Sequence, residues 1–165
     1  MCSFGVRKMN EESASAKSRL RCREIMTSNV LTTTGEMSLR DAAQMMKDGD
    51  IGVLPVVERE TNKLVGIVTD RDIVVRVVAV GKGADATVAE AMTTELFTAK
   101  PDDFAFEAIR TMGERQVRRI PIVDDAGVLQ GIVSMADVAL EMEDEREIAE
   151  TLEEISSGTA FWKKA

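Results

Sequence analysis

Apolar side chains recur with helical spacing between residues 38 and 49. They return every three or four positions, which predicts a helix with one buried face. Ser38 and Asp41 have the spacing of a capping box at the start of this helix, and Gly49 is a typical residue for its end. The predicted buried face consists of Leu39, Ala42, Ala43 and Met46.

β-type sequence flanks this helix on both sides. A short β-favouring stretch, 30–33, precedes it, and two further β-type runs, 52–57 and 64–69, follow it on either side of the polar turn 58–63. The two later runs predict a hairpin. Pro55 lacks a backbone N–H, so we expect it at the start of its strand or on an unpaired edge.

The stretch 66–73 returns later in the chain as 131–138. Both copies read glycine, two β-branched residues, a hydroxyl, two variable positions, an aspartate and an aliphatic residue. Further pairs share an offset of 66 (92 − 26, 121 − 55) or 65 (131 − 66), namely Met26 with Met92, Pro55 with Pro121 and Gly66 with Gly131. The core face of the first helix recurs as Ala108, Ile109 and Met112. A period of this length, present twice, indicates duplication into two equivalent subdomains.

The duplication also decides the structure of stretch 70–80. Its valines prefer strands, but the matching stretch 136–143 consists of good helix formers. Since equivalent segments share a fold, we expect a helix in both copies.

Composition limits the classes of function. The 165 residues carry a net charge of −8, which argues against broad attraction to nucleic acids or anionic membranes. The chain has no histidine, and Cys2 and Cys22 both lie near its start, so neither a metal site nor a disulfide framework is expected. No apolar run reaches the length of a membrane span, and we expect a cytoplasmic protein.

Both ends of the chain differ from its body. The opening segment is basic and poor in large apolar residues, and we expect 1–20 to be disordered. A basic arm that contacts a partner is the alternative. Residues 143–165 are predicted to form an acidic helical extension and a tail with Trp162, which needs a surface of the same chain or of a second subunit to cover it.

Two copies of Met-Thr, strand, helix, x-Pro-Val-Val, turn and Gly-Ile-Val-[Thr/Ser]-x-x-Asp resemble the cystathionine-β-synthase (CBS) domain family, over about residues 25–142. The resemblance implies an α/β (α+β) fold of two tandem β-α-β-β-α subdomains, packed with pseudo-twofold symmetry. The expected boundaries are 21–83 and 84–142. The resemblance also implies clefts between the repeats that bind AMP, ATP, NAD(H) or S-adenosylmethionine, and a homodimer of such pairs.

Each hydroxyl–carboxylate pair, Thr69 with Asp72 and Ser134 with Asp137, has two readings. A [Ser/Thr]-x-x-[Asp/Glu] sequence before an apolar run is a capping box that satisfies amides at the start of a helix. An aspartate can also accept two hydrogen bonds from a ribose diol, and a hydroxyl beside the first amides of a helix suits a phosphate. The two readings are compatible, and the family resemblance implies ribose contact for both aspartates.

Arginines near these pairs are candidates for phosphate binding. Arg118 and Arg119 precede a predicted strand and could hold phosphate oxygens in bidentate fashion, or form a surface pair. The first copy has Gly52 and Val53 there, so the two clefts should differ. Arg71, between Asp70 and Asp72, could reach phosphate or pair with its neighbours. The remaining candidate ligand contacts, whose alternative is core packing, are Val53, Leu54, Pro55, Ile120 and Pro121.

The leading hypothesis is a regulatory module that senses an adenosine-containing ligand. A second is a structural or protein-binding module with vestigial clefts, which acts on an unidentified protein target through its acidic C-terminal helix and tail. An enzyme is not expected, because histidine, a phosphate-loop motif and a plausible cysteine nucleophile are all missing. No cofactor is required by any motif.

Overall fold

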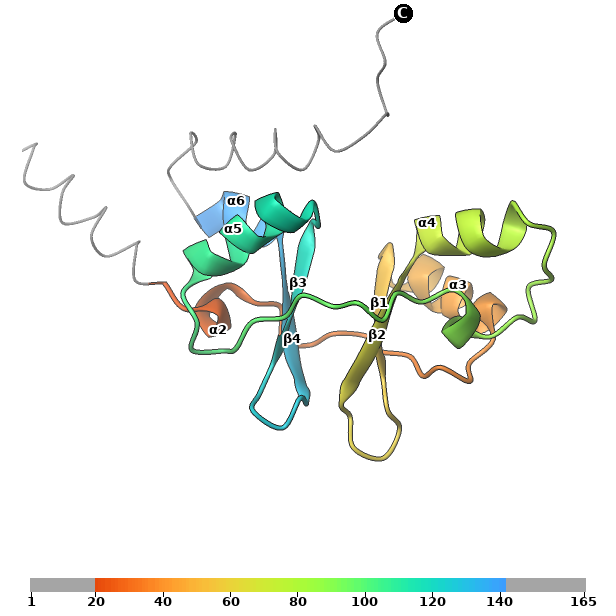
Figure 1. Cartoon of the computed structure of the whole chain (residues 1–165), viewed down its shortest axis with the longest axis horizontal. Coiled ribbons are helices and arrows are strands. Elements are labelled where there is room, and N and C mark those ends of the chain that lie inside the picture. Colours follow the sequence, from red (N-terminus) through yellow and green to blue (C-terminus); the bar gives the residue numbers. More distant parts are fainter. Residues whose placement is uncertain (1–19, 142–165) are drawn as a thin grey trace, which may run out of the picture. The chain divides into compact units, whose positions relative to one another are not determined.

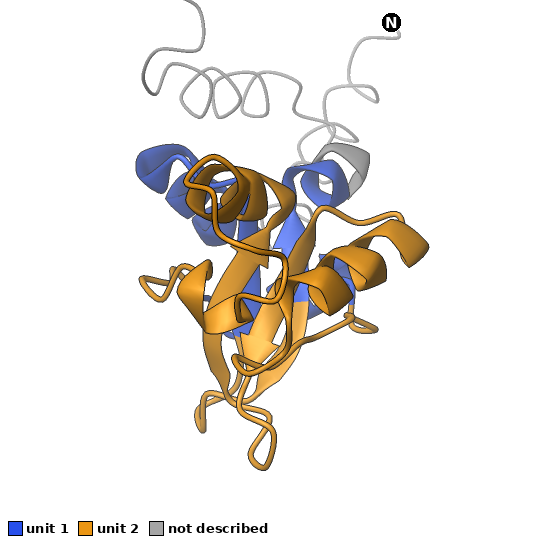
Figure 2. Ribbon diagram, turned by 90° about the vertical axis from the view of Figure 1, so that its right-hand side faces the viewer, with its two compact units in different colours: residues 1–27, 98–122, 132–165 blue, residues 28–97, 123–131 orange. Residues whose placement is uncertain are grey.

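The computed structural model of the chain describes residues 20–141, which divide into two compact units (Figures 1 and 2). Unit 2 combines residues 28–97 with 123–131, and the described part of unit 1 combines 20–27, 98–122 and 132–141. Two expectations concern segments outside the described residues. They are the disorder of 1–20, of which only Leu20 is described, and the acidic extension and tail at 143–165. Mixed helices and strands confirm the expected fold class.

Unit 2 contains the first copy of the repeated pattern. The predicted helix and hairpin are both present, and a second helical segment follows the hairpin. The elements are α3 (Leu39–Asp48), β1 (Val53–Val57), β2 (Leu64–Thr69), α4 (Asp70–Ile73), the π-helix η1 (Val74–Val78) and the 3₁₀ helix η2 (Val88–Glu90).

Helix α3 begins as its sequence predicts. The Ser38 Oγ accepts a hydrogen bond from the Asp41 N–H at 3.1 Å, which completes the cap. Leu39, Ala42 and Met46 are buried as expected, but the fourth predicted core residue, Ala43, is exposed. Gly49 caps the helix in a right-handed conformation, and the left-handed turn is taken by the next residue, Asp50, with φ of 49°.

The β1–β2 hairpin is antiparallel, and Pro55 pairs with Ile67 in its middle. The expectation of a strand start for Pro55 is therefore wrong, and so is that of an unpaired edge, because the edge of β1 away from β2 forms a bridge to Thr33. There its carbonyl accepts a hydrogen bond from the Thr33 N–H at 3.0 Å. Only Thr33 of the β-favouring stretch 30–33 pairs with β1, through a parallel bridge to Val56.

The stretch 70–80 is helical, as the second copy predicted, but it is not a regular α-helix. After α4 the hydrogen bonding shifts to the π pattern of η1, in which the Ala79 N–H donates to the Val74 carbonyl at 2.9 Å. Val77 faces the core with 1% exposure. The other valines of this segment are exposed: Val74, Val75, Val78 and Val80.

Unit 1 contains the second copy. The elements of this copy and of residues 20–27, which pack with it, are α2 (Cys22–Ile25), α5 (Ala105–Arg115), β3 (Arg119–Val123), β4 (Leu129–Ser134) and α6 (Met135–Glu141), and β3 and β4 form a two-stranded sheet. The turn end of this sheet, 123–131, is grouped with unit 2. The predicted core positions Ala108, Ile109 and Met112 are all buried. Helix α5 ends at Gln116 with φ of 54°, which matches Asp50 at an offset of 66 (116 − 50).

The segment that precedes each copy in the sequence packs in the unit of the other copy. In unit 2, the Leu39 N–H donates to the Ala86 carbonyl at 2.8 Å. In unit 1, the equivalent Ala105 N–H donates to the Leu20 carbonyl at the same distance. Each compact unit is therefore completed by a segment that lies outside its own repeat in the sequence.

Cys22 takes part in the core of unit 1 rather than in chemistry. Its side chain is fully buried and occupies the position that Val88 fills in unit 2. Burial, followed by the nearby carboxylates of Asp103 and Glu107, raises the pKa of the Cys22 thiol to about 11. The thiol is therefore protonated at neutral pH and is a poor nucleophile.

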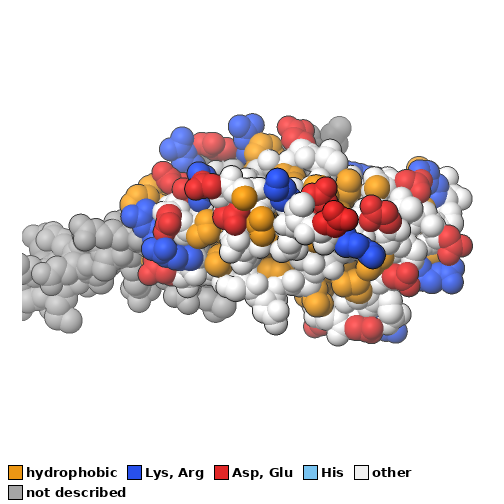
Figure 3. Space-filling view, turned by 90° about the horizontal axis from the view of Figure 1, so that it is seen from below, with side chains coloured by type: hydrophobic (Ala, Val, Ile, Leu, Met, Phe, Trp, Pro, Cys, Tyr) orange, Lys and Arg blue, Asp and Glu red, His pale blue; other side chains and the backbone are white. Residues whose placement is uncertain are grey.

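The surface mixes charges of both signs. On the face that Figure 3 shows, acidic and basic side chains are interspersed with apolar ones. Within residues 20–141, no helix has the length and apolar character that crossing a membrane requires.

Candidate functional site

In unit 2, the carboxylate of Asp72 is fixed by the end of strand β2. The Thr69 N–H donates to Asp72 Oδ2 at 3.0 Å, and the Thr69 hydroxyl donates to the same oxygen at 2.7 Å. In return, the Asp72 N–H donates to the Thr69 Oγ1 at 3.1 Å. These bonds confirm the predicted capping box at the start of α4.

Unit 1 repeats this geometry at the end of β4. The Ser134 N–H and hydroxyl donate to Asp137 Oδ2 at 2.8 and 2.6 Å. The Asp137 N–H lies 3.4 Å from the Ser134 Oγ, which is a longer bond than in unit 2. Both carboxylates are half-buried. In each unit the residue with the hydroxyl, Thr69 or Ser134, binds only the Oδ2 atom of the carboxylate.

The second carboxylate oxygen differs between the units. Asp137 Oδ1 has no hydrogen-bond or ion-pair partner among the described residues. Asp72 Oδ1 forms an ion pair with Arg76 Nη2 at 3.3 Å, with the Asp72 side chain 16% exposed and the Arg76 side chain 43%. An ionised carboxylate offers about four lone pairs, so the outward oxygen of Asp137 can accept further donors.

Arg76 is a residue of the site that the sequence reasoning missed. Its Nη1 donates to the carbonyls of Ala91 and Met92 at 2.7 and 3.0 Å, and its Nη2 donates to the Thr93 hydroxyl at 3.0 Å. The i, i+4 spacing from Asp72 was the available signal, since such pairs are neighbours on a helix. The equivalent residue of the second copy is Glu141, which cannot donate a hydrogen bond to a carbonyl in its ionised form.

The residue that precedes each hairpin differs between the units: it is the uncharged Gly52 in unit 2 and the basic Arg118 in unit 1. The Asp70 N–H donates to the Gly52 carbonyl at 3.1 Å, and the equivalent Met135 N–H donates to the Arg118 carbonyl at the same distance. A Cβ on Gly52 would lie 3.0 Å from Asp70 Oδ2, so this carboxylate lies against the glycine. An acidic side chain in unit 2 thus faces the position where unit 1 has Arg118.

The first amides of α4 are already engaged by the protein. The Asp70 N–H donates to Gly52, the Arg71 N–H donates to Asp70 Oδ1 at 2.7 Å, and the Asp72 N–H donates to Thr69. A phosphate in unit 2 would have to displace one of these oxygens. The expectation that these amides suit a phosphate is therefore not supported for the first copy.

Four of the remaining candidates belong to the cores. Leu54 and Ile120 are fully buried, and Pro55 and Pro121 are buried in the middle of their strands. The carbonyls of both prolines are paired, since the Ala99 N–H donates to Pro121 at 3.1 Å as Thr33 does to Pro55.

Three further candidates lie closer to the surface. Val53 and Arg119 are half-buried at the starts of β1 and β3, and Arg118 is exposed.

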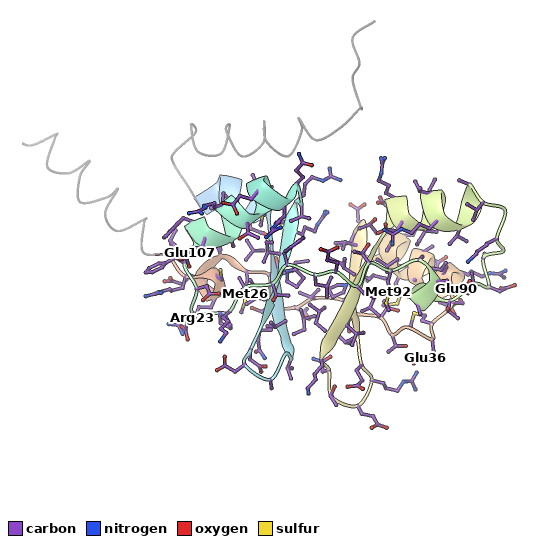
Figure 4. The ribbon with its side chains drawn as sticks, in the orientation of Figure 1. Arg23, Met26, Glu36, Glu90, Met92 and Glu107 are labelled. Atoms are coloured by element: carbon purple, nitrogen blue, oxygen red, sulfur yellow. The ribbon has the colours of Figure 1, made fainter. Side chains whose placement is uncertain are left out.

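Equivalent methionines lie beside the two hairpins. Figure 4 labels Met26 in unit 1 and Met92 in unit 2. The Met92 sulfur would lie 2.7 Å from a Cβ on Gly66, so a larger residue at this point of β2 would require the Met92 side chain to move. The neighbouring Thr93 exchanges two backbone hydrogen bonds with Ile67 at 2.8 and 2.9 Å, which fixes the segment that Arg76 contacts.

A surface pocket of about 600 Å³ lies elsewhere in unit 2. Its lining includes Glu36, Glu58, Val65 and Met92, of which Glu36 and Met92 are labelled in Figure 4, and none of the candidate ligand residues. The pairs Thr69–Asp72 and Ser134–Asp137 therefore do not line this pocket. Among residues 20–141, no three or more carboxylates and cysteines gather in a group that could hold a metal ion.

A comparison with known protein families supplies the family. The model of the CBS domain matches this chain twice, at residues 22–79 and 88–144. The chain belongs to the CBS-domain family. The resemblance noted from the sequence is thereby confirmed, and CBS-domain pairs are regulatory ligand-binding modules.

Relatives and solved structures agree with this assignment. The CBS domain-containing protein YhcV of Bacillus subtilis is 37% identical over 118 residues, which cover 72% of this chain and 82% of YhcV. The crystal structure of Hypoxic Response Protein I, described with two coordinated zinc ions, has a TM-score of 0.67 and 34% identity and covers 74% of this chain and 99% of that one. The protein of that name from Mycobacterium tuberculosis is 35% identical over 118 residues.

A third structure contains adenosine-type ligands. The CBS-domain pair of protein MJ0100 was solved in complex with 5′-methylthioadenosine and S-adenosyl-L-methionine. It has a TM-score of 0.65 and 29% identity, and the match covers 73% of this chain and 94% of that one.

Proposed function

We propose that this CBS-domain pair is a regulatory module that binds an adenosine-containing ligand through its hydroxyl–carboxylate pairs. The observation that carries the proposal is the geometry of Asp137, whose Oδ2 is held by Ser134 while Oδ1 has no partner among the described residues. A ribose 2′,3′-diol supplies two O–H donors for such an oxygen. The adenosine-type ligands of the MJ0100 domain pair support the same class of ligand.

The ligand belongs to a set that shares adenosine: AMP, ATP, NAD(H) and S-adenosylmethionine. Arg118, exposed beside the start of β3, gives unit 1 a cation for a phosphorylated member of this set. Regulation requires that the ligand bind two conformations, or two dimer arrangements, with different affinities. No further cofactor is part of the proposal.

Isothermal titration of the full chain with AMP, ATP, NADH and S-adenosylmethionine tests this function. We expect at least one ligand to bind with a dissociation constant at or below about 100 μM, which corresponds to roughly −5.5 kcal/mol. Absence of binding by all four, in a protein with a cooperative melting transition, would refute the proposal. Attention would then move to recognition of a protein partner.

We also propose that two chains associate through the valine face of η1. Val74, Val75 and Val78 expose 57%, 51% and 65% of their surface, which is unusual for three large apolar residues within one helical turn. The double variant Val75→Glu and Val78→Glu should convert a dimer to a monomer, because it buries two charges in the interface. Light scattering after gel filtration would show this, and a wild-type protein that is already monomeric at about 100 μM would exclude the interface.

A further inference from the structure

We infer that the two copies of the site are not equivalent, and that each chain binds one nucleotide tightly, at Asp137, because Arg76 occupies the equivalent carboxylate of the first copy. This inference rests on the proposed function, since it concerns the same hydroxyl–carboxylate pairs. It also assigns a role in ligand selectivity to Arg76.

The first observation is the difference between the two outward oxygens. Asp72 Oδ1 is paired with Arg76 Nη2 at 3.3 Å, whereas Asp137 Oδ1 has no partner among the described residues. A ribose diol at Asp72 therefore has to compete with this cation for the lone pairs of Oδ1. At Asp137 the same diol meets no competing cation among residues 20–141.

The second observation is that Arg76 is anchored. Its guanidinium donates to the carbonyls of Ala91 and Met92 and to the Thr93 hydroxyl, in addition to the ion pair with Asp72. Thr93 is in turn fixed to strand β2 by its two backbone hydrogen bonds with Ile67. Several hydrogen bonds hold the guanidinium in place, so its movement away from Asp72 would break them and cost free energy.

The third observation concerns the phosphate. In unit 2, Asp70 lies against Gly52, and in unit 1 the equivalent positions are Met135 and Arg118. Asp70 lies in the same helical turn as Asp72, so its charge acts on a ligand there within the Debye length of about 8 Å at physiological salt. This charge offsets that of Arg71 in the same turn and so weakens the attraction for a phosphorylated ligand in the first copy. In the second copy Arg118 has the uncharged Met135 at the equivalent position.

Together, these three differences predict how many AMP molecules each chain binds tightly and how Arg76 affects the weaker site. Titration with AMP should give one tight site per chain in the wild type. Asp137→Asn should remove that site, and Asp72→Asn should leave it intact. The weak first site should gain affinity by about 1.5-fold to fivefold in Arg76→Gln, since the value of a partly exposed ion pair lies in this range.

Two further variants separate the ion pair from a general loosening of the fold. Arg76→Lys keeps a cation beside Asp72, and we expect it to keep the wild-type stoichiometry. The combination of Arg76→Gln with Asp72→Asn should lose the affinity that Arg76→Gln gained. A structural effect of Arg76 alone would alter the melting temperature without producing either of these patterns.

Calorimetry with AMP on the full chain and these variants is the test. One tight site that depends on Asp137 supports the inference. Two sites of equal affinity in the wild type, or a tight site that depends on Asp72, would overturn it while leaving the proposed function in place. If neither the wild type nor any variant binds AMP, ATP, NADH or S-adenosylmethionine, the inference and the proposed function both fail.

Discussion

Replacement of both Asp72 and Asp137 by asparagine is expected to lower the affinity for the adenosine ligand by at least about a hundredfold. Each carboxylate would lose its charge and one of its two acceptor oxygens. Hydrogen bonds to charged groups contribute about 1.5–3 kcal/mol each, so the loss of two at the tight site gives this factor. Asparagine retains an oxygen that can accept the Thr69 or Ser134 N–H, and the helix caps can persist. Calorimetric titration measures the change.

A matched control for this variant exists within the same chain. Asp41 takes part in the cap of α3 with Ser38: its N–H donates to the Ser38 Oγ at 3.1 Å, and the Ser38 hydroxyl donates to Asp41 Oδ2 at 2.8 Å. Asp41→Asn should therefore cost a similar amount of helix stability and leave ligand affinity unchanged. If the double variant melts cooperatively and still binds as the wild type does, the carboxylates do not hold the ligand.

Truncation of Leu54 to alanine should destabilise the protein by about 2–5 kcal/mol. Leu54 is fully buried in the core of unit 2, where it pairs with Val68 across the hairpin. Its loss removes the transfer free energy of three methyl or methylene equivalents and leaves a cavity. Ile120, the equivalent residue of unit 1, is also fully buried and should show a loss in the same range. Urea unfolding followed by circular dichroism measures both.

Leu31→Ala provides the comparison for this prediction. Leu31 is 48% exposed, so its truncation should change the free energy of unfolding by no more than about 0.5 kcal/mol. Equal losses for Leu54→Ala and Leu31→Ala would contradict the burial described for unit 2. They would also remove the reason for placing the Leu54 side chain in the core rather than against a ligand.

Local signals in the sequence predicted most of the secondary structure. The hydroxyl and carboxylate spacing located the starts of α3 and α4, and the polar turn between two β-type runs located the β1–β2 hairpin. Both features depend on residues close together in the chain. The duplication supplied what propensity could not, since the valine-rich stretch 70–80 is helical although valine favours strands.

Features that depend on distant residues were not predictable in the same way. Residues 20–27 pack with the second copy, and residues 84–97 pack with the first. This packing includes hydrogen bonds between residues more than 40 positions apart, such as that of Leu39 with Ala86. Ala43 shows a related limit, because helical spacing placed it at the margin of the apolar face and only the tertiary structure leaves it exposed.

The candidate site was predicted in part. The sequence identified both hydroxyl–carboxylate pairs and the two arginines at the start of β3, and their roles in binding remain a proposal. It did not identify Arg76, whose contacts with Ala91, Met92 and Thr93 join positions 15 to 17 residues away. The difference between an engaged and an open carboxylate oxygen is a property of three-dimensional contacts, and no local pattern encodes it.

The most direct test of the central claim compares two ligands that differ only in the diol. The full chain would be titrated with the adenosine ligand that binds it best and with the 2′,3′-dideoxy form of that ligand. If Asp137 accepts the ribose hydroxyls, the dideoxy form should bind at least about tenfold more weakly, and Asp137→Asn should bind both forms with similar affinity. Equal affinity of the wild type for the two forms would contradict the assignment of the hydroxyl–carboxylate pair to ribose.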